Sequence, residues 1–127
     1  GFYRTDIKDG TILRANNKCA EILGFENVGY MKKNTKASDL YSPELRSKLI
    51  EMLNDTGSVT NFEIPLTEGT WIALSAKLNI KRGYLEGSIV DITYRKIIEK
   101  KLQQHREKEM ESLKSIQENV ATRLLEF

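Results

Sequence analysis

Residues 84–93 read YLEGSIVDIT, and this stretch decides the fold because it joins two kinds of secondary structure. Leu85, Gly87 and Ile89 alternate with other residues at the two-residue period of a half-buried strand. After Thr93 the chain has neither glycine nor proline, and glutamate, lysine, glutamine and leucine dominate it. That composition favours one long helix. The stretch therefore predicts a last strand that passes directly into a terminal helix.

Two further strands precede this one and complete an antiparallel meander. Short turns, Thr67-Glu68-Gly69 and Lys81-Arg82-Gly83, separate the three strands. The predicted inner face comprises Thr60, Phe62, Ile64 and Leu66, then Ile72, Leu74, Ala76, Leu78 and Ile80. The opposite face is partly apolar as well, through Trp71, Ala73, Val90 and Ile92. Such a strip often marks contact with a helix or another chain, so Trp71 is either an interface anchor or covered by its own chain.

The first half of the chain predicts a hairpin followed by short helices. Asp9-Gly10 lies between two short apolar-polar stretches, Phe2 to Ile7 and Thr11 to Asn16, as in a β-hairpin turn. The helical pieces that follow are Lys18 to Leu23, capped by Asn17, then Val28 to Lys33 and Ala37 to Tyr41. Ser42-Pro43-Glu44 begins a longer helix, which Gly57 ends. The predicted class is α+β, with a five-stranded antiparallel sheet, short helices on one face and a long C-terminal helix.

The composition excludes several classes of protein. The 20 basic and 18 acidic residues are interspersed and give a net charge of only +2, so we expect no direct contact with nucleic acid. A single cysteine cannot form an intrachain disulfide. No apolar run approaches the roughly 20 residues that cross a bilayer, and no signal peptide is present. We expect a cytoplasmic protein without membrane insertion, and since both ends look cut, a piece of a longer polypeptide.

The order of elements and three motifs resemble a PAS domain. The first is residues 9–12, DGTI, with residues 16–25, NNKCAEILGF; the second is residues 71–80; the third is residues 84–93, which end in Asp-Ile-Thr. Each motif alone is weak, but their order and spacing together are specific. The resemblance covers about residues 1–96. It implies a sensor domain over residues 1–93 and a signalling helix over residues 94–127.

The resemblance also assigns a role to the junction between strand and helix. It implies that Asp91, Thr93 and Arg95 relay signals, with Thr93 as the N-cap and Asp91 pairing Arg95 or Lys96. An acidic residue commonly follows the threonine in the family, whereas Tyr94 stands here, and Lys96 occupies the position where a capping box has Glu or Gln. We therefore expect a less firmly fixed helix start. The alternative is a purely structural junction, in which a strand ends at an ordinary helix cap.

The apolar inner faces predict either a filled core or a pocket for a small ligand. The pocket residues would be Leu23, Leu40, Phe62, Ile64, Ile72, Leu74 and Ile89, with few polar side chains among them. A haem-binding domain of this kind needs an axial ligand within the fold, and the sole histidine, His105, lies on the terminal helix. Flavin-binding photosensory relatives place a reactive cysteine near the middle helix, but Ala37 to Tyr41 has none, and Cys19 is interpreted as a buried apolar residue. We expect neither haem nor covalent flavin, and no metal site; the ligand stays unknown.

Apolar residues along the terminal helix recur at spacings of three and four. The positions expected at a dimer contact are Ile98, Leu102, Leu113, Ile116, Val120 and Leu124. The pattern is poor between Arg106 and Glu109. A helix this long is marginal without a partner, so we expect a coiled-coil homodimer through this helix and the sheet face; the alternative is a single packed or solvated helix.

The sequence bears on three classes of function. The first is a sensory input domain that relays a signal to a downstream effector such as a histidine kinase, a diguanylate cyclase or a DNA-binding regulator, as the resemblance implies. The second is a ligand-free module that only aligns two effector helices. The third is an enzyme, but convergent carboxylates, a Cys–His pair and a metal cluster are all missing from the sequence pattern. We expect no catalytic activity in this chain.

Overall fold

The computed structural model describes residues 1–66 and 69–125, and side chains as far as residue 123. The chain divides into two compact units, Gly1–Thr93 and Tyr94–Phe127. The first unit holds a sheet with its covering helices, and the second belongs to one long helix. Within the described residues, no helix combines the length and the apolar character that crossing a bilayer requires.

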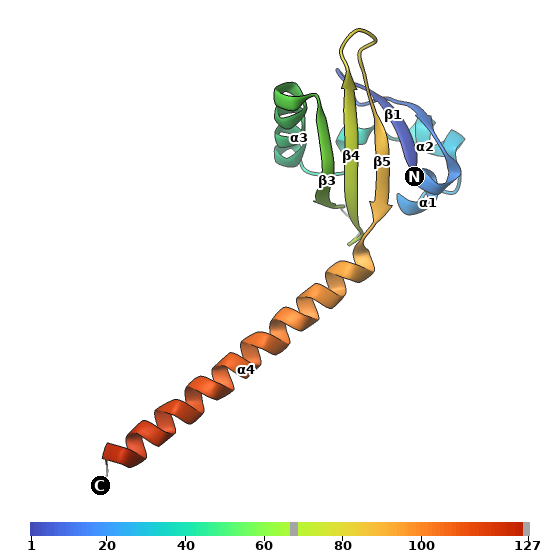
Figure 1. The fold of residues 1–127 in the computed structure, drawn as a ribbon. Helices are drawn as coiled ribbons and strands as arrows, with labels where there is room; N and C mark the ends of the chain where they lie inside the picture. The colour runs from blue at the N-terminus through green and yellow to red at the C-terminus, as the bar shows by residue number, and fades with distance from the viewer. Residues whose placement is uncertain (67–68, 126–127) are drawn as a thin grey trace. The chain divides into compact units, whose positions relative to one another are not determined.

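The sheet has five antiparallel strands in the order β2-β1-β5-β4-β3. They are β1 (Phe2–Asp6), β2 (Ile12–Ala15), β3 (Ser58–Pro65), β4 (Trp71–Asn79) and β5 (Tyr84–Asp91). The first and last strands therefore lie side by side, although about 80 residues separate them (Figure 1). This long-range pairing closes the unit and leaves β2 and β3 at the edges.

Four helical segments cover one face of the sheet (Figure 1). They are α1 (Asn17–Ile22), α2 (Val28–Asn34), the 3₁₀ turn η1 (Ala37–Asp39) and α3 (Pro43–Thr56); α4 (Thr93–Leu125) follows the last strand. The predicted fold class is confirmed, since this is an α+β, PAS-like arrangement with a long C-terminal helix. The helix predicted to extend to Tyr41 ends earlier, as a single 3₁₀ turn.

The caps follow the sequence with one correction. Ser42 Oγ accepts a hydrogen bond from the N–H of Leu45 at the start of α3, as Ser-Pro predicts. The predicted cap of α1, Asn17, is wrong, because Asn16 holds that position. Asn16 Oδ1 accepts from the N–H groups of Cys19 and of Phe2, both at 3.0 Å. One amide oxygen thus begins the helix and ties it to β1, which Asn17 cannot do from inside the first turn.

The core lies between the sheet and its helices. Its most completely buried side chains are Met31, Leu49, Leu53, Ile64 and Cys19. Each apolar side chain of this size that is withdrawn from water contributes roughly 1.5–3 kcal/mol. The packing of both layers onto one another therefore stabilises the unit, and short helices such as α1 persist because they are part of it.

Two inward-facing predictions in the meander are wrong. Between Val59 and Phe62 the β3–β4 register shifts, and Asn61 has a φ of +53°, which is the geometry of a β-bulge. The extra residue turns Val59 inward and leaves Thr60 exposed. At the far end of β4, Asn79 Oδ1 accepts from the N–H of Arg82 and closes the turn. Ile80 therefore lies in that turn, 79% exposed.

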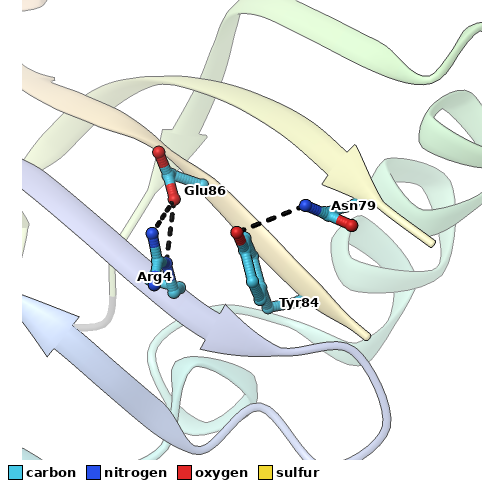
Figure 2. A network of polar contacts seen from close by, with 4 residues as sticks. All are labelled: Arg4, Asn79, Tyr84 and Glu86. Atoms are coloured by element: carbon cyan, nitrogen blue, oxygen red, sulfur yellow. Dashed lines mark hydrogen bonds and ion pairs between the residues drawn. The ribbon is translucent and has the colours of Figure 1, made fainter. Parts of the chain in front are cut away.

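The outer face of the sheet has a polar network across β1, β5 and β4 (Figure 2). Arg4 donates from Nε at 2.8 Å and Nη2 at 2.5 Å to one carboxylate oxygen of Glu86, its direct partner on β5. The same guanidinium lies 4.3 Å from the ring centre of Tyr84, whose hydroxyl accepts from Asn79 Nδ2. The network fastens the N-terminal strand to β5 and, through Tyr84, to β4.

Candidate functional site

The end of β5 and the beginning of α4 are held by the side chain of Asp91. Its Oδ1 accepts the backbone N–H of Thr93 at 2.9 Å and the hydroxyl of Thr93 at 2.6 Å. An Asp oxygen bonding two residues ahead stabilises a turn in place of a strand. Thr93 is the first residue of α4, so the prediction that Thr93 is the N-cap is wrong. Asp91 orders the turn, and this frees the Thr93 hydroxyl to face the sheet.

That hydroxyl connects the junction to the neighbouring strand. Thr93 Oγ1 accepts the backbone N–H of Trp71, the first residue of β4, at 3.0 Å. The carbonyl of Trp71 in turn accepts the N–H of Ile92 at 2.9 Å. The start of α4 is therefore bonded to β4 as well as continuous with β5.

The charge state of Asp91 is set by the same bonds. Its pKa lies below its usual value, because the hydroxyl and then the backbone N–H of Thr93 stabilise the carboxylate; Lys18 adds a smaller effect in the same direction, and desolvation opposes it. Asp91 is otherwise exposed. The ionised form is thus the form that holds the junction.

The third predicted relay residue, Arg95, belongs to the second unit. Its Nε lies 3.5 Å from Glu99 Oε1, and Lys96 Nζ lies 3.5 Å from the other oxygen of Glu99. Exposed pairs one helical turn apart contribute about 0.3–0.5 kcal/mol each. These contacts support the first turns of α4.

A cavity of about 40 Å³ lies between the sheet and the helices of the first unit. Of the predicted pocket residues, its wall includes Leu23, Leu40, Ile72, Leu74 and Ile89. Phe62 and Ile64 are not part of the wall: Ile64 is fully buried in the core and Phe62 is half-buried. The reason is that β3 lies at the sheet edge against α3, whereas the cavity lies over β1, β2, β4 and β5.

The wall also includes polar side chains that the sequence analysis missed. These are Tyr3 and Thr5 from β1, Cys19 from α1, Tyr41 before α3 and Arg46 within α3. The two-residue alternation of β1, with Arg4 outside, was the available indication for Tyr3 and Thr5. Tyr41 and Arg46 join them only through the tertiary fold. The surface of the wall is nevertheless mostly apolar, in keeping with the prediction that few polar side chains point inward.

Three of these groups make hydrogen bonds at the cavity. The Tyr3 hydroxyl donates to the carbonyl of Ser75 on β4 at 3.3 Å, and Arg46 Nη1 donates to the Tyr41 hydroxyl at 3.2 Å. Burial raises the pKa of Tyr3, with Tyr41 and Cys19 adding to the rise and Arg46 opposing it. Burial also raises the pKa of Cys19 to about 11. Both groups are protonated at neutral pH, so the thiol is a poor nucleophile there.

The cavity volume limits what can enter without rearrangement. An engineered cavity of about 150 Å³ accepts benzene, and a water molecule in the liquid occupies about 30 Å³. A volume of about 40 Å³ thus suits water or a molecule of a few non-hydrogen atoms.

Apolar residues of α4 lie exposed along the second unit. Ile98, Leu102, Leu113, Ile116 and Val120 are 45–58% exposed, whereas the side chain of Leu124 lies outside the described residues. His105 Nε2 lies 3.0 Å from Glu109 Oε1, one turn along. Across residues 1–66 and 69–125, no three metal-binding side chains gather. An isolated helix of this length with such a seam has apolar surface available for a partner.

Neither a protein-family model nor a curated protein sequence matches this chain.

Proposed function

We propose that this chain is a PAS-type sensory module that passes a signal from its sheet to α4, and through α4 to an effector. The observation that supports this most directly is the bonding of Thr93. Its hydroxyl accepts from Trp71 of β4 and donates to Asp91 of β5, so the helix start responds to both strands. A helix that served only as a rigid spacer would need no hydrogen bond to β4. The Asp-Ile-Thr resemblance supports the same role.

The proposal extends to the setting of the module. α4 would pair with the same helix of a second copy through its exposed apolar seam, and a register change or rotation would reach a kinase, cyclase or DNA-binding domain. We further propose that the module acts in the cytoplasm, makes no direct contact with nucleic acid and has no catalytic activity of its own. The free thiol of Cys19 is compatible with a reducing compartment.

A second candidate function is favoured by the small size of the cavity. At about 40 Å³ the unit can fold around water alone, and then it would only align two copies of α4. Gentle purification followed by mass spectrometry of released small molecules separates the two functions. A stoichiometric ligand supports sensing, whereas its absence together with a constitutive dimer supports alignment.

The relay is tested by joining residues 1–127 in heptad register to the dimerisation and catalytic domains of a histidine kinase. Thr93→Val keeps the shape of the side chain and removes both hydroxyl bonds. Each such bond contributes about 1 kcal/mol, so if both exist in only one output state, autophosphorylation changes by up to about thirtyfold. Asp55→Asn, at an exposed position near the end of α3, is the matched control. Equal activity of the Thr93 variant, the control and the parent would refute the relay.

A further inference from the structure

The cavity has a charged group at its wall that no acid of the described residues neutralises. Arg46 is half-buried, and its hydrogen bond within the described residues goes to the hydroxyl of Tyr41. None of the described carboxylates lies within ion-pair distance of it. A guanidinium has five N–H donors, and one of them is engaged here. The other N–H donors of Arg46 make no hydrogen bond with the described residues.

The surroundings hold Arg46 close to the cavity. It lies on α3, and its Nη2 is 3.4 Å from the place that a Cβ on Gly10 would occupy. Gly10 itself has a φ of +76°, and its carbonyl accepts the N–H of Ala37, another residue of the wall. The β1–β2 turn and η1 thus lie close to the guanidinium, and a Cβ at Gly10 would be in van der Waals contact with it.

Two hydroxyl groups face the same space with hydrogen-bonding capacity unused. Thr5 is 2% exposed, and its hydroxyl makes no hydrogen bond with the described part of the chain. Thr5 is also a member of the cavity wall. The Tyr41 hydroxyl accepts from Arg46 and keeps its own proton to donate. Arg46, Tyr41 and Thr5 together offer donors that an anion can accept.

The rest of the wall is apolar, with Met31, Leu74 and Ile89 among its members. Such a wall favours a ligand with a hydrocarbon part over a fully hydrated anion such as phosphate. Arginine binds a planar carboxylate through two parallel hydrogen bonds. The volume of about 40 Å³ restricts the hydrocarbon part to one or two carbons.

We propose that this cavity binds a short-chain aliphatic monocarboxylate of two or three carbons. Its carboxylate lies on Arg46 and Tyr41, and its alkyl end lies among the apolar residues beneath. This inference rests on the proposed sensory function, since it names the ligand class of that module. Because very small ligands gain limited free energy per atom, the Kd is on the order of micromolar at best.

The test is a titration of residues 1–127 with sodium acetate and sodium propionate at constant ionic strength, followed by amide NMR shifts. Propionamide, which has the same size without charge, and inorganic phosphate are the comparison compounds. We expect saturable shifts at cavity residues with the carboxylates only. Arg46→Gln should weaken binding at least tenfold, and Arg82→Gln, at an exposed turn position, should leave it unchanged.

Three results would overturn the proposal: no saturable shift with any carboxylate, equal binding of propionamide, or unchanged affinity in the Arg46 variant. Should Arg46→Gln fail to fold, Tyr41→Phe removes one donor and should weaken binding about fivefold. The outcome is independent of the kinase fusion. Carboxylate binding without an effect of Thr93→Val would refute the relay alone, whereas an effect of Thr93→Val without binding would refute this site alone.

Discussion

Replacing Gly87 with alanine tests the packing of the central strands. Gly87 lies on β5 opposite Tyr3 of β1 and Ala76 of β4. A Cβ there would lie 1.9 Å from the carbonyl oxygen of Ser75 and 2.8 Å from the Cα of Ala76. The Tyr3 side chain reaches across this position, since its hydroxyl donates to the same Ser75 carbonyl. Gly87 thus gives room both for the approach of β4 and for the tyrosine that lines the cavity.

The expected loss of stability follows from these distances. The contact with Ser75 would be about 1.5 Å shorter than an ordinary van der Waals contact, and both atoms belong to backbone or to a rigid methyl group, so no rotamer relieves it. Overpacking in a core costs about 1–3 kcal/mol, and a backbone clash belongs at the upper end. Disturbing the Tyr3–Ser75 bond adds about 1 kcal/mol. We expect a loss of about 4 kcal/mol from a domain whose total stability is about 5–14 kcal/mol.

Urea unfolding followed by the fluorescence of Trp71 measures this loss, because the single tryptophan lies in the same unit. Gly83→Ala is the matched control. Gly83 has a φ of +72°, and a Cβ added there would meet nothing within 4 Å, so this variant tests backbone conformation without a clash, at about 1–2 kcal/mol. If Gly87→Ala destabilises the protein no more than Gly83→Ala, the steric argument is refuted.

Two further predictions concern titrating groups. Because the pKa of Asp91 is lowered in the fold, its carboxylate stabilises the folded protein above the unfolded pKa near 3.8, and this stabilisation is lost as pH falls through the folded pKa. The difference in Tm between the parent and Asp91→Asn should therefore shrink below about pH 4. A difference that stays constant with pH would contradict this. Asp9, whose pKa is also lowered through its bonds to Thr11, remains in both proteins and cancels from that comparison. Cys19 should react slowly with a thiol reagent at pH 8 and faster as pH approaches 11, while the unfolded chain reacts quickly at pH 8; rapid reaction of the folded chain would refute the buried, protonated thiol.

The sequence predicted those elements whose determinants are local. Asp9-Gly10 forms the turn of the first hairpin, Ser42-Pro43 begins α3, and the change of period after Gly57 marks the meander. In each case a neighbouring residue supplies the hydrogen bond or the backbone geometry. Short-range chemistry was enough to assign the fold class.

Errors arose where a distant residue decides between local options. Asn16 caps α1 in place of Asn17 because Phe2 shares its oxygen. The face of Val59 depends on the bulge at Asn61, whose N–H donates to Ser75 Oγ on β4. Each partner lies 14 residues away, beyond the few residues that a local cap or strand pattern covers.

The candidate site shows the same division. Asp91 and Thr93 are close in sequence and were identified, but the bond from Thr93 to Trp71 spans 22 residues and was not. Tyr41 and Arg46 were assigned no role, because only the packing of α3 and η1 onto β1 brings them to the cavity. A long polar side chain on an amphipathic helix usually faces water, and nothing local marks this arginine as different.

The bulge in β3 has a consequence for how copies of this protein can meet. An edge strand of a sheet can pair with a strand of a second chain, and long, flat edge strands promote aggregation. Of the two edge strands here, β2 has only four residues. The other, β3, is kinked at Asn61 and ends on Pro65, which has no N–H to donate. Edge-to-edge polymerisation is thereby hindered at both sides, and self-association is left to side-chain surfaces, whose sequence can specify a partner.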